Sequence, residues 1–229
     1  MVKLYQFQSS PFCEKVRRIL NYKGVDFETV EVDRRQVALH VNVSPFGKFP
    51  AISNGDDAVC DSTDIAYYLE EKFPEKSLIP TDEKLNAQMH MAEDWADESL
   101  YFYEITMRLS WEHNARQTVK KVMATLPPEL SEEQALSLML NGSQKLIAAQ
   151  GMGRKTKEQV IADAERHLKA ISVTVGESGY MVGDSITLAD ISVISQLGCM
   201  LDATEVRQMI ESYPNVSNWM NRVNDLAAP

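Results

Sequence analysis

The strongest constraint on the fold is a change in hydrophobic period near residue 80. Before residue 74, short stretches that alternate apolar and polar residues are interleaved with helical stretches, whereas from residue 83 apolar residues recur at helical spacing. The segment between them, PEKSLIPTDEK, carries two prolines and a cluster of charges. We therefore predict an α/β domain over residues 1–77, a linker over residues 78–83 and an all-helical domain over residues 84–229.

The first domain reads as strand, helix, strand, short helical piece, two strands and helix. Asn54-Gly55 separates the last two strands, and this pair is a strong local signal for a hairpin. A strand-helix-strand beginning favours parallel pairing with a right-handed crossover, so we expect a mixed four-stranded sheet with helices packed on it. The expected segments are strands at 3–7, 25–33, 48–53 and 57–61 and helices at 10–24, 35–43 and 61–74.

The helical domain carries clear start and stop signals. Thr187, followed three residues later by Asp190, is a variant of the capping box, in which each side chain accepts a hydrogen bond from the other's free backbone N–H. We assign this pair a structural role and no catalytic one. Thr156 is expected to cap the helix that follows it. The Pro-Pro pair at 127–128 and the NGSQ segment at 141–144 are expected to interrupt the helices.

Charge and composition exclude several classes of function. The 229 residues carry a formal net charge of −10, which argues against nucleic acid or an anionic membrane as the main partner, since either requires a basic face. No apolar run reaches the length of a membrane span or a signal peptide, and we expect a cytoplasmic location. Cys13, Cys60 and Cys199 are odd in number and widely spaced, which argues against a disulfide framework or a zinc site, and we expect no metal.

The stretch QSSPFCEKVRRIL places Ser10 directly before a predicted helix. Free backbone N–H groups and the helix dipole converge at this point, so they stabilise an anion such as a thiolate, and a hydroxyl donor adds a further bond. No histidine lies near Ser10 in the sequence to act as a base, so Ser10 suits the role of donor to another molecule's thiolate better than that of nucleophile. The alternative is a purely structural N-cap before Pro11.

Cys13 follows Ser10 by three residues, at the second position of a C-x-x-C pair whose first position is a serine. Dithiol exchange within this motif is therefore excluded. We expect Cys13 to lie toward the helix interior and to behave as a small apolar residue. A reactive thiol is the alternative interpretation.

Two further stretches combine polar groups with the end of a predicted strand. SPFGKFPAIS places Lys48 and the Phe49-Pro50 bond directly before a strand, where a proline indicates a cis bond or an open strand edge. A cis bond would turn the backbone N–H and C=O of Phe49 outward, ready to pair with an extended peptide. At the next strand-helix junction, Asp61 can take an ammonium group, while the N–H and hydroxyl of Ser62 can take a carboxylate. Helix capping alone is the alternative for this second pair.

In their order and spacing, these motifs resemble the glutathione transferase family. SSPFCEKVR, SPFGKFPAI and CDSTDIAYYL are similar to the family's thioredoxin-like amino-terminal domain, and GDSITLADISV is similar to the capping-box helix of its carboxy-terminal domain. The resemblance spans residues 3 to 223. It implies an α/β thioredoxin-like domain followed by an all-α domain, with glutathione as the co-substrate lying extended over the first domain.

The resemblance also implies roles for individual residues. Ser10 matches the serine that holds the cysteinyl thiol of glutathione as a thiolate, and it is the expected catalytic residue. Phe49 would pair through its backbone with the cysteinyl part, and Asp61 with Ser62 would bind the γ-glutamyl end. The expected glutathione-binding residues are Phe12, Lys48, Phe49, Pro50, Asp61 and Ser62.

The resemblance assigns the binding sites of the glycyl carboxylate and of the second substrate less precisely. Arg34 and Arg35 lie where the family often places a cation for that carboxylate, and Lys48 matches a position near the peptide backbone or the same carboxylate. The second substrate is expected to be a small hydrophobic electrophile, conjugated in a detoxification reaction between the two domains. A homodimer is also implied, with Phe46 as our expected anchor. The expected wall residues, which can equally form a buried core stripe, are Tyr101, Tyr103, Met107 and Trp111.

Departures from the family pattern leave two other functions open. SPFC is similar to the prostaglandin E synthase type 2 motif, which begins with cysteine, and QGMGRKTKEQV is similar to the failed-axon-connections and metaxin-like branch. The first alternative is a non-catalytic binding or scaffold protein that keeps the fold. The second is a glutathione-dependent thiol transferase or isomerase that uses Cys13.

Overall fold

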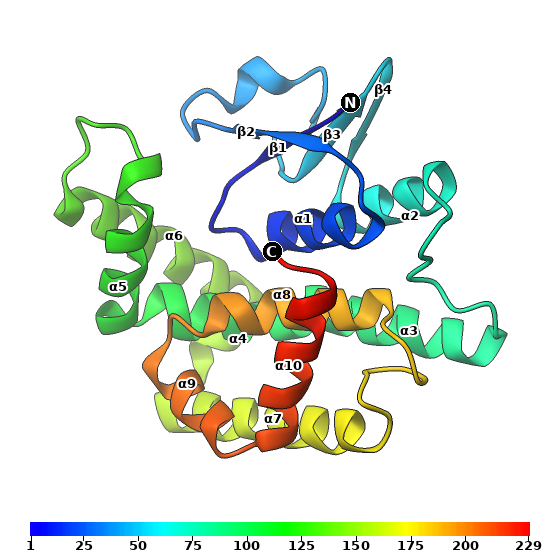
Figure 1. Cartoon of the computed structure of the whole chain (residues 1–229). Coiled ribbons are helices and arrows are strands. Elements are labelled where there is room, and N and C mark those ends of the chain that lie inside the picture. The colour runs from blue at the N-terminus through cyan, green and yellow to red at the C-terminus, as the bar shows by residue number, and fades with distance from the viewer.

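Figure 1 shows the computed structural model of the chain, in which a small sheet with two helices lies against a larger bundle of helices. The structure describes the backbone of residues 1–229 and all side chains except that of Glu177. A thioredoxin-like α/β domain is followed by an all-helical domain, as the sequence predicts. The first domain contains β1 Val2–Gln6, α1 Pro11–Lys23, β2 Phe27–Glu31, the 3-10 turn η1 Val37–His40, β3 Ala51–Asn54, β4 Asp57–Cys60 and α2 Ser62–Lys72.

The second domain begins with a helix that continues from Glu83 to Ser110 through two wider, π-helical turns. Such turns are rare and are frequent at functional sites. The elements are α3 Glu83–Trp95, the π-helical η2 Ala96–Leu100, α4 Tyr101–Glu104, the π-helical η3 Ile105–Ser110, α5 Glu112–Val122, the 3-10 turn η4 Met123–Thr125, α6 Glu132–Gln150, the 3-10 turn η5 Met152–Arg154, α7 Lys157–Ser178, α8 Leu188–Met200, α9 Thr204–Glu211 and α10 Pro214–Leu226.

The sheet has the strand order β2-β1-β3-β4. Strands β1 and β2 pair in parallel, with Tyr5 opposite Val30, while β3 pairs antiparallel with both β1 and β4. Val2 and Leu4 are buried and alternate with more exposed residues, as the period of a strand requires. The predicted mixed four-stranded sheet is confirmed.

Helix α1 is bounded by residues that suit its two ends. Pro11 occupies the first turn, where no backbone N–H is needed, and Gly24 ends the helix in the left-handed conformation with φ of 70°. Val16, Ile19 and Leu20 are fully buried. In Figure 1, α1 lies between the sheet and α8, against which it packs. The amino end of α1 is therefore placed where the two domains meet.

One predicted interruption of the helical domain is wrong. The NGSQ segment at 141–144 lies inside α6. A Cβ on Gly142 would meet nothing within 4 Å, so open space surrounds this glycine, and the hydroxyl of Ser143 donates to the Leu109 carbonyl at 2.9 Å. Tertiary contact with η3 thus overrides a local preference for a turn. The Pro-Pro pair at 127–128 does lie between helices, as predicted.

Helix α8 forms the centre of the bundle, and nearly all of its side chains are buried. Its predicted capping box is present, because Asp190 accepts hydrogen bonds from the N–H and the hydroxyl of Thr187 at 2.9 and 3.0 Å. The same carboxylate accepts from the Met181 N–H and from the Trp219 indole, both at 2.8 Å. Thr156 caps α7, also as predicted.

Polar contacts from α1 and from the segment between the domains join the two parts. Arg18 donates to the Asn224 side chain at 2.9 Å and to the Ala227 carbonyl at 2.8 Å. The N–H of Leu188, at the start of α8, donates to the Leu78 carbonyl at 2.9 Å. Because the Leu78 side chain is also buried, this connecting segment is packed against the bundle.

Replacing Asp190 by alanine should lower the free energy of unfolding by about 3 kcal/mol or more, because buried donors lose their acceptor. Urea unfolding monitored by circular dichroism measures the change. Asp184, which is exposed in the preceding loop, provides the matched control. Equal stability of the Asp190→Ala and Asp184→Ala variants would contradict this role.

Candidate active site

The stretches that the sequence analysis selected lie at one edge of the sheet. Tyr5 is opposite Ala51, and Ala51 is opposite Cys60. The end of β1, the beginning of β3 and the end of β4 are therefore adjacent. The segments next to these strand ends are 7–10, which leads into α1, 49–50, which precedes β3, and 61–62, where α2 begins.

Ser10 occupies the N-cap position of α1, but its side chain makes no capping hydrogen bond. Its backbone is extended, with φ of −86° and ψ of 129°, and its N–H donates to the Phe7 carbonyl at 2.9 Å. The hydroxyl of a serine at this position usually accepts a hydrogen bond from a backbone N–H in the first turn of the helix. Capping of α1 therefore does not account for the Ser10 hydroxyl, which interacts instead with the Cys13 thiol.

Cys13 is fully buried, as expected for a small apolar residue. Its sulfur accepts a hydrogen bond from the Phe7 N–H at 3.4 Å. Burial raises the pKa of the Cys13 thiol, against the smaller lowering effects of Phe7 and the Ser10 hydroxyl. A buried thiol with a raised pKa is a weak nucleophile, so the structure does not favour exchange through Cys13.

The bond between Phe49 and Pro50 is cis, as expected. The N–H and C=O of Phe49 make no hydrogen bond within the part of the chain that the structure describes. Lys48 is exposed, and its carbonyl accepts the Ser44 hydroxyl at 2.5 Å. The turn before β3 therefore presents free backbone groups of Phe49 beside an exposed cation.

Asp61 has a backbone conformation that is rare for residues other than glycine, with φ of 80° and ψ of 132°. Such conformations cost about 1–3 kcal/mol and concentrate at functional sites. Its Oδ1 accepts the N–H groups of Thr63 at 2.9 Å and Asp64 at 3.4 Å, so the carboxylate caps α2 through one oxygen. Ser62 is buried, and its hydroxyl has no partner among the described residues.

The two candidate arginines have different surroundings. Arg35 forms ion pairs with Asp33, at 2.8 Å, and with Glu129 of the helical domain. Arg34 places its guanidinium 3.9 Å from the centre of the Phe7 ring and has no ion pair with the described residues. Of the two, Arg34 is therefore the cation that is free to bind an anion.

The four predicted wall residues separate into two groups. Tyr103, Met107 and Trp111 are buried and belong to the core of the helical domain. Tyr101 is half-buried, and its ring lies 4.8 Å from that of Phe12 between centroids. Burial raises the pKa of Tyr101 to about 12. Phe12 and Tyr101 thus form an apolar contact between the domains beside Ser10.

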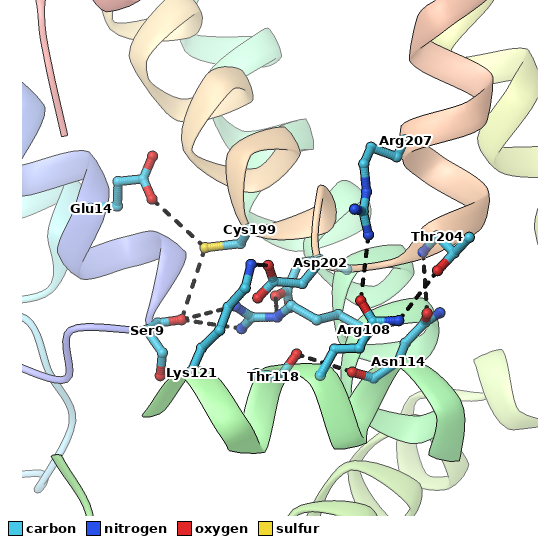
Figure 2. A network of polar contacts seen from close by, with 12 residues as sticks. Ser9, Glu14, Arg108, Asn114, Thr118, Lys121, Cys199, Asp202, Thr204 and Arg207 are labelled. Atoms are coloured by element: carbon cyan, nitrogen blue, oxygen red, sulfur yellow. Dashed lines mark hydrogen bonds and ion pairs between the residues drawn. The ribbon is translucent and has the colours of Figure 1, made fainter. Parts of the chain in front are cut away.

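Sequence reasoning missed Arg108, which is 4% exposed and lies in η3. Figure 2 shows its guanidinium directed at the Ser9 carbonyl, to which both terminal nitrogens donate at 3.1 Å. Glu104, fully buried one turn earlier, forms an ion pair with Arg108. Opposite charges four residues apart in an otherwise apolar helix are the sequence signal that marks such a pair.

A second buried charge cluster surrounds Lys15 of α1 and was also missed. Lys15 forms ion pairs with Glu93 and with Asp97, the latter at 2.7 Å, and it donates to Thr63 at 3.2 Å. The Thr63 hydroxyl donates to Glu93 at 2.6 Å. Since Thr63 follows Ser62, this cluster connects the helical domain to the start of α2.

None of the helices in the described structure combines the length and apolar character needed to cross a bilayer. Within the same residues, no three side chains of histidine, cysteine, aspartate or glutamate are grouped so that they can hold a metal ion.

The sheet, the bundle and the polar groups at the edge of the sheet define a glutathione transferase fold with a serine at the start of α1. Two family models match: Glutathione S-transferase, N-terminal domain, over residues 4–77, and Glutathione S-transferase, C-terminal domain, over residues 142–228. The chain therefore belongs to the glutathione S-transferase family.

Relatives from plants and bacteria match along nearly the whole chain. Glutathione S-transferase F12 of Arabidopsis thaliana is 21% identical and covers 98% of this chain and 94% of its own length. The isoprene-epoxide–glutathione S-transferase of a Rhodococcus species is 26% identical, with 93% and 91% covered. The structure of the beta-etherase LigF from Sphingobium sp. strain SYK-6 matches with a TM-score of 0.69 at 23% identity, over 97% of this chain and 94% of the other.

Burial raises the pKa of Glu104 from an ordinary value of 4.5 to about 7, against the opposing effect of Arg108. A carboxyl whose pKa is raised by folding stabilises the protein below its unfolded pKa and loses that contribution as pH rises through the folded value. The free energy of unfolding should therefore fall by about 3 kcal/mol from this group between about pH 4.5 and about pH 7.

In a Glu104→Gln variant this part of the pH dependence should disappear. Urea unfolding at several pH values in that window measures it. The exposed Glu98 on the same continuous helix provides the control variant, Glu98→Gln. Parallel pH curves for the native protein and the Glu104→Gln variant would contradict the titration of Glu104.

Proposed function

We propose that this protein is a glutathione transferase in which the Ser10 hydroxyl stabilises the thiolate of bound glutathione. The observation that carries the proposal is the Ser10 side chain, which stands at the amino end of α1 and makes no capping hydrogen bond. The resemblance of the SSPFCEKVR motif to the family supports this role for Ser10. Family membership supports glutathione as the co-substrate.

The energy that thiolate formation requires is within reach of this arrangement. Lowering the pKa of a thiol from about 9 to about 6.5 takes roughly 3 kcal/mol of differential stabilisation. One hydrogen bond to a charged group contributes about 1.5–3 kcal/mol, and a helix amino end contributes about 0.3–1 kcal/mol. The thiolate then attacks a soft electrophile by addition or displacement.

The other groups at the edge of the sheet suit an extended peptide with charged ends. The unpaired backbone of Phe49 would bind the cysteinyl part of glutathione, and Asp61 with Ser62 would bind the γ-glutamyl ammonium and carboxylate. Arg34 and Lys48 are the cations for the glycyl carboxylate, because Arg35 is already paired with acids.

The second substrate is proposed to be a small apolar electrophile in contact with Tyr101, whose ring packs on that of the predicted glutathione-binding residue Phe12. A relative named for an epoxide substrate supports an electrophile of this class. A homodimer with Phe46 as an anchor, a cytoplasmic location and a role in detoxification remain predictions. Phe46 is 81% exposed in the single chain. A residue that anchors an interface between subunits must be exposed before the subunits associate.

Replacing Ser10 by alanine should raise the apparent pKa of bound glutathione by about 1 to 2 pH units, because the thiolate loses a charge-assisted donor. The ultraviolet absorbance of the thiolate and the pH dependence of kcat/KM with an aromatic halide measure the change. Ser9→Ala is the matched control, since the observed Arg108 contact with Ser9 uses only its backbone carbonyl.

An unchanged pH profile in the Ser10→Ala variant would remove Ser10 from this role. Retention of the native protein on immobilised glutathione, without turnover of any electrophile in a broad panel, would instead favour the scaffold alternative. Disulfide-reductase activity that Cys13→Ser abolishes would favour thiol transfer.

Replacing Asp61 by asparagine should raise the Kd for glutathione roughly tenfold or more while kcat at saturation changes little, because an ammonium loses its carboxylate. Asparagine keeps an oxygen to cap α2 and tolerates a positive φ, so the backbone is preserved. Calorimetry measures the affinity. The exposed neighbour Asp64 gives the control, Asp64→Asn, and equal affinities for the two variants would exclude Asp61 from the binding site.

A further inference from the structure

The contact between Arg108 and Ser9 joins the helical domain to the loop that carries Ser10. The two residues are 99 positions apart in the sequence, and both terminal nitrogens of the guanidinium donate to one carbonyl oxygen at 3.1 Å. A buried guanidinium is costly unless it is compensated by charge and hydrogen bonds. Glu104 supplies the charge, and the Ser9 carbonyl supplies the acceptor.

The Ser9 carbonyl and the Ser10 N–H belong to the same planar peptide unit. Arg108 holds the oxygen of this unit from the helical domain, and the Phe7 carbonyl holds its N–H at 2.9 Å from the first domain. A peptide plane held on both sides has little freedom to rotate. That plane and the Ser10 φ of −86° together set the direction of the Cα–Cβ bond, about which the hydroxyl rotates.

We infer that Arg108, braced by Glu104, is a positioning residue that fixes the Ser9–Ser10 peptide plane and thereby directs the Ser10 hydroxyl toward the sulfur of glutathione. This inference rests on the proposed function. It makes the helical domain a part of the thiolate-stabilising machinery as well as a wall for the second substrate.

Other charged and titratable groups surround the Glu104–Arg108 pair. Tyr101 on α4, Cys199 on α8 and Asp202 beyond α8 influence Arg108, and the guanidinium of Arg34 faces it from the first domain. Burial raises the pKa of the Cys199 thiol, which lies 3.9 Å from the Ser9 carbonyl as a second, weaker donor. Figure 2 shows this sulfur and Arg108 directed at the same oxygen.

The test is a double-mutant cycle between Arg108 and Ser10. Arg108→Lys keeps the charge but loses the two-pronged donor, so it should raise the apparent pKa of bound glutathione and lower kcat roughly tenfold or more. KM for glutathione should stay nearly constant, because the groups that bind the peptide are untouched. In a Ser10→Ala background, Arg108→Lys should have no further effect on the thiolate pKa.

Two further variants control for stability. Arg18→Lys changes an equally buried arginine that also joins the domains but does not contact Ser9, so it should reduce stability without moving the thiolate pKa. If Arg108→Lys does not fold, the combined variant Glu104→Gln and Arg108→Met removes both charges and keeps most of the side-chain volume. This combined variant should raise the thiolate pKa and accelerate hydrogen exchange at the Ser10 amide.

Three results would overturn the inference while leaving the proposed function intact. An unchanged thiolate pKa in Arg108→Lys, or in the combined variant where that one fails to fold, would show that the contact is only structural. If Arg108→Lys shifts the thiolate pKa equally in the native and Ser10→Ala backgrounds, Arg108 acts on the thiolate directly through its charge. An equal shift in Arg18→Lys would show general loosening. If Ser10→Ala leaves the pKa of bound glutathione unchanged, the proposed function is overturned together with the inference. If only the Arg108 variant leaves that pKa unchanged, the role of Ser10 stands.

Discussion

The structure depends on the burial of helix α1 from two sides, by the sheet and by α8 (Figure 1). This placement takes three cations of one helix, Lys15, Arg18 and Lys23, out of solvent. A charge in such a position must be paired or bound by several acceptors. Glu70 and the Phe73 carbonyl compensate Lys23, while the other two have partners in both domains: Thr63 and Glu14 in the first, and Glu93, Asp97, Asn224 and the Ala227 carbonyl in the helical domain. Hydrophobic burial therefore brings the domains together, and the ionic contacts determine how they are aligned.

Much of the first domain could be predicted because its signals are local. The alternation of apolar residues, the Asn-Gly turn and the left-handed Gly24 define strands and helices without knowledge of any distant contact. Strand order then brings the segments around Ser10, Phe49 and Asp61 to one edge of the sheet. Cys13 could be assigned to the interior for the same reason, since it falls on the apolar side of α1.

The contacts between the helical domain and α1 could not be predicted, because they depend on which face of that domain meets α1. Periodicity shows that the segment after Glu83 is helical, but it does not reveal the π-helical turns that rotate the face carrying Glu104 and Arg108. The same limit explains the NGSQ segment, whose turn tendency is overridden by a contact with η3. It also explains Ser10 and Asp61, which look alike in the sequence as residues before a helix, although only Asp61 caps its helix through its side chain.

The way Lys15 and Arg18 are compensated has a consequence for recombination between relatives. A first domain grafted onto a foreign helical bundle would bring its buried cations to an interface that lacks their acids and carbonyls. The hybrid would then have to hydrate those charges or open the interface. Fragment exchange within this family should therefore succeed only when the donor supplies matching residues on both sides of the junction.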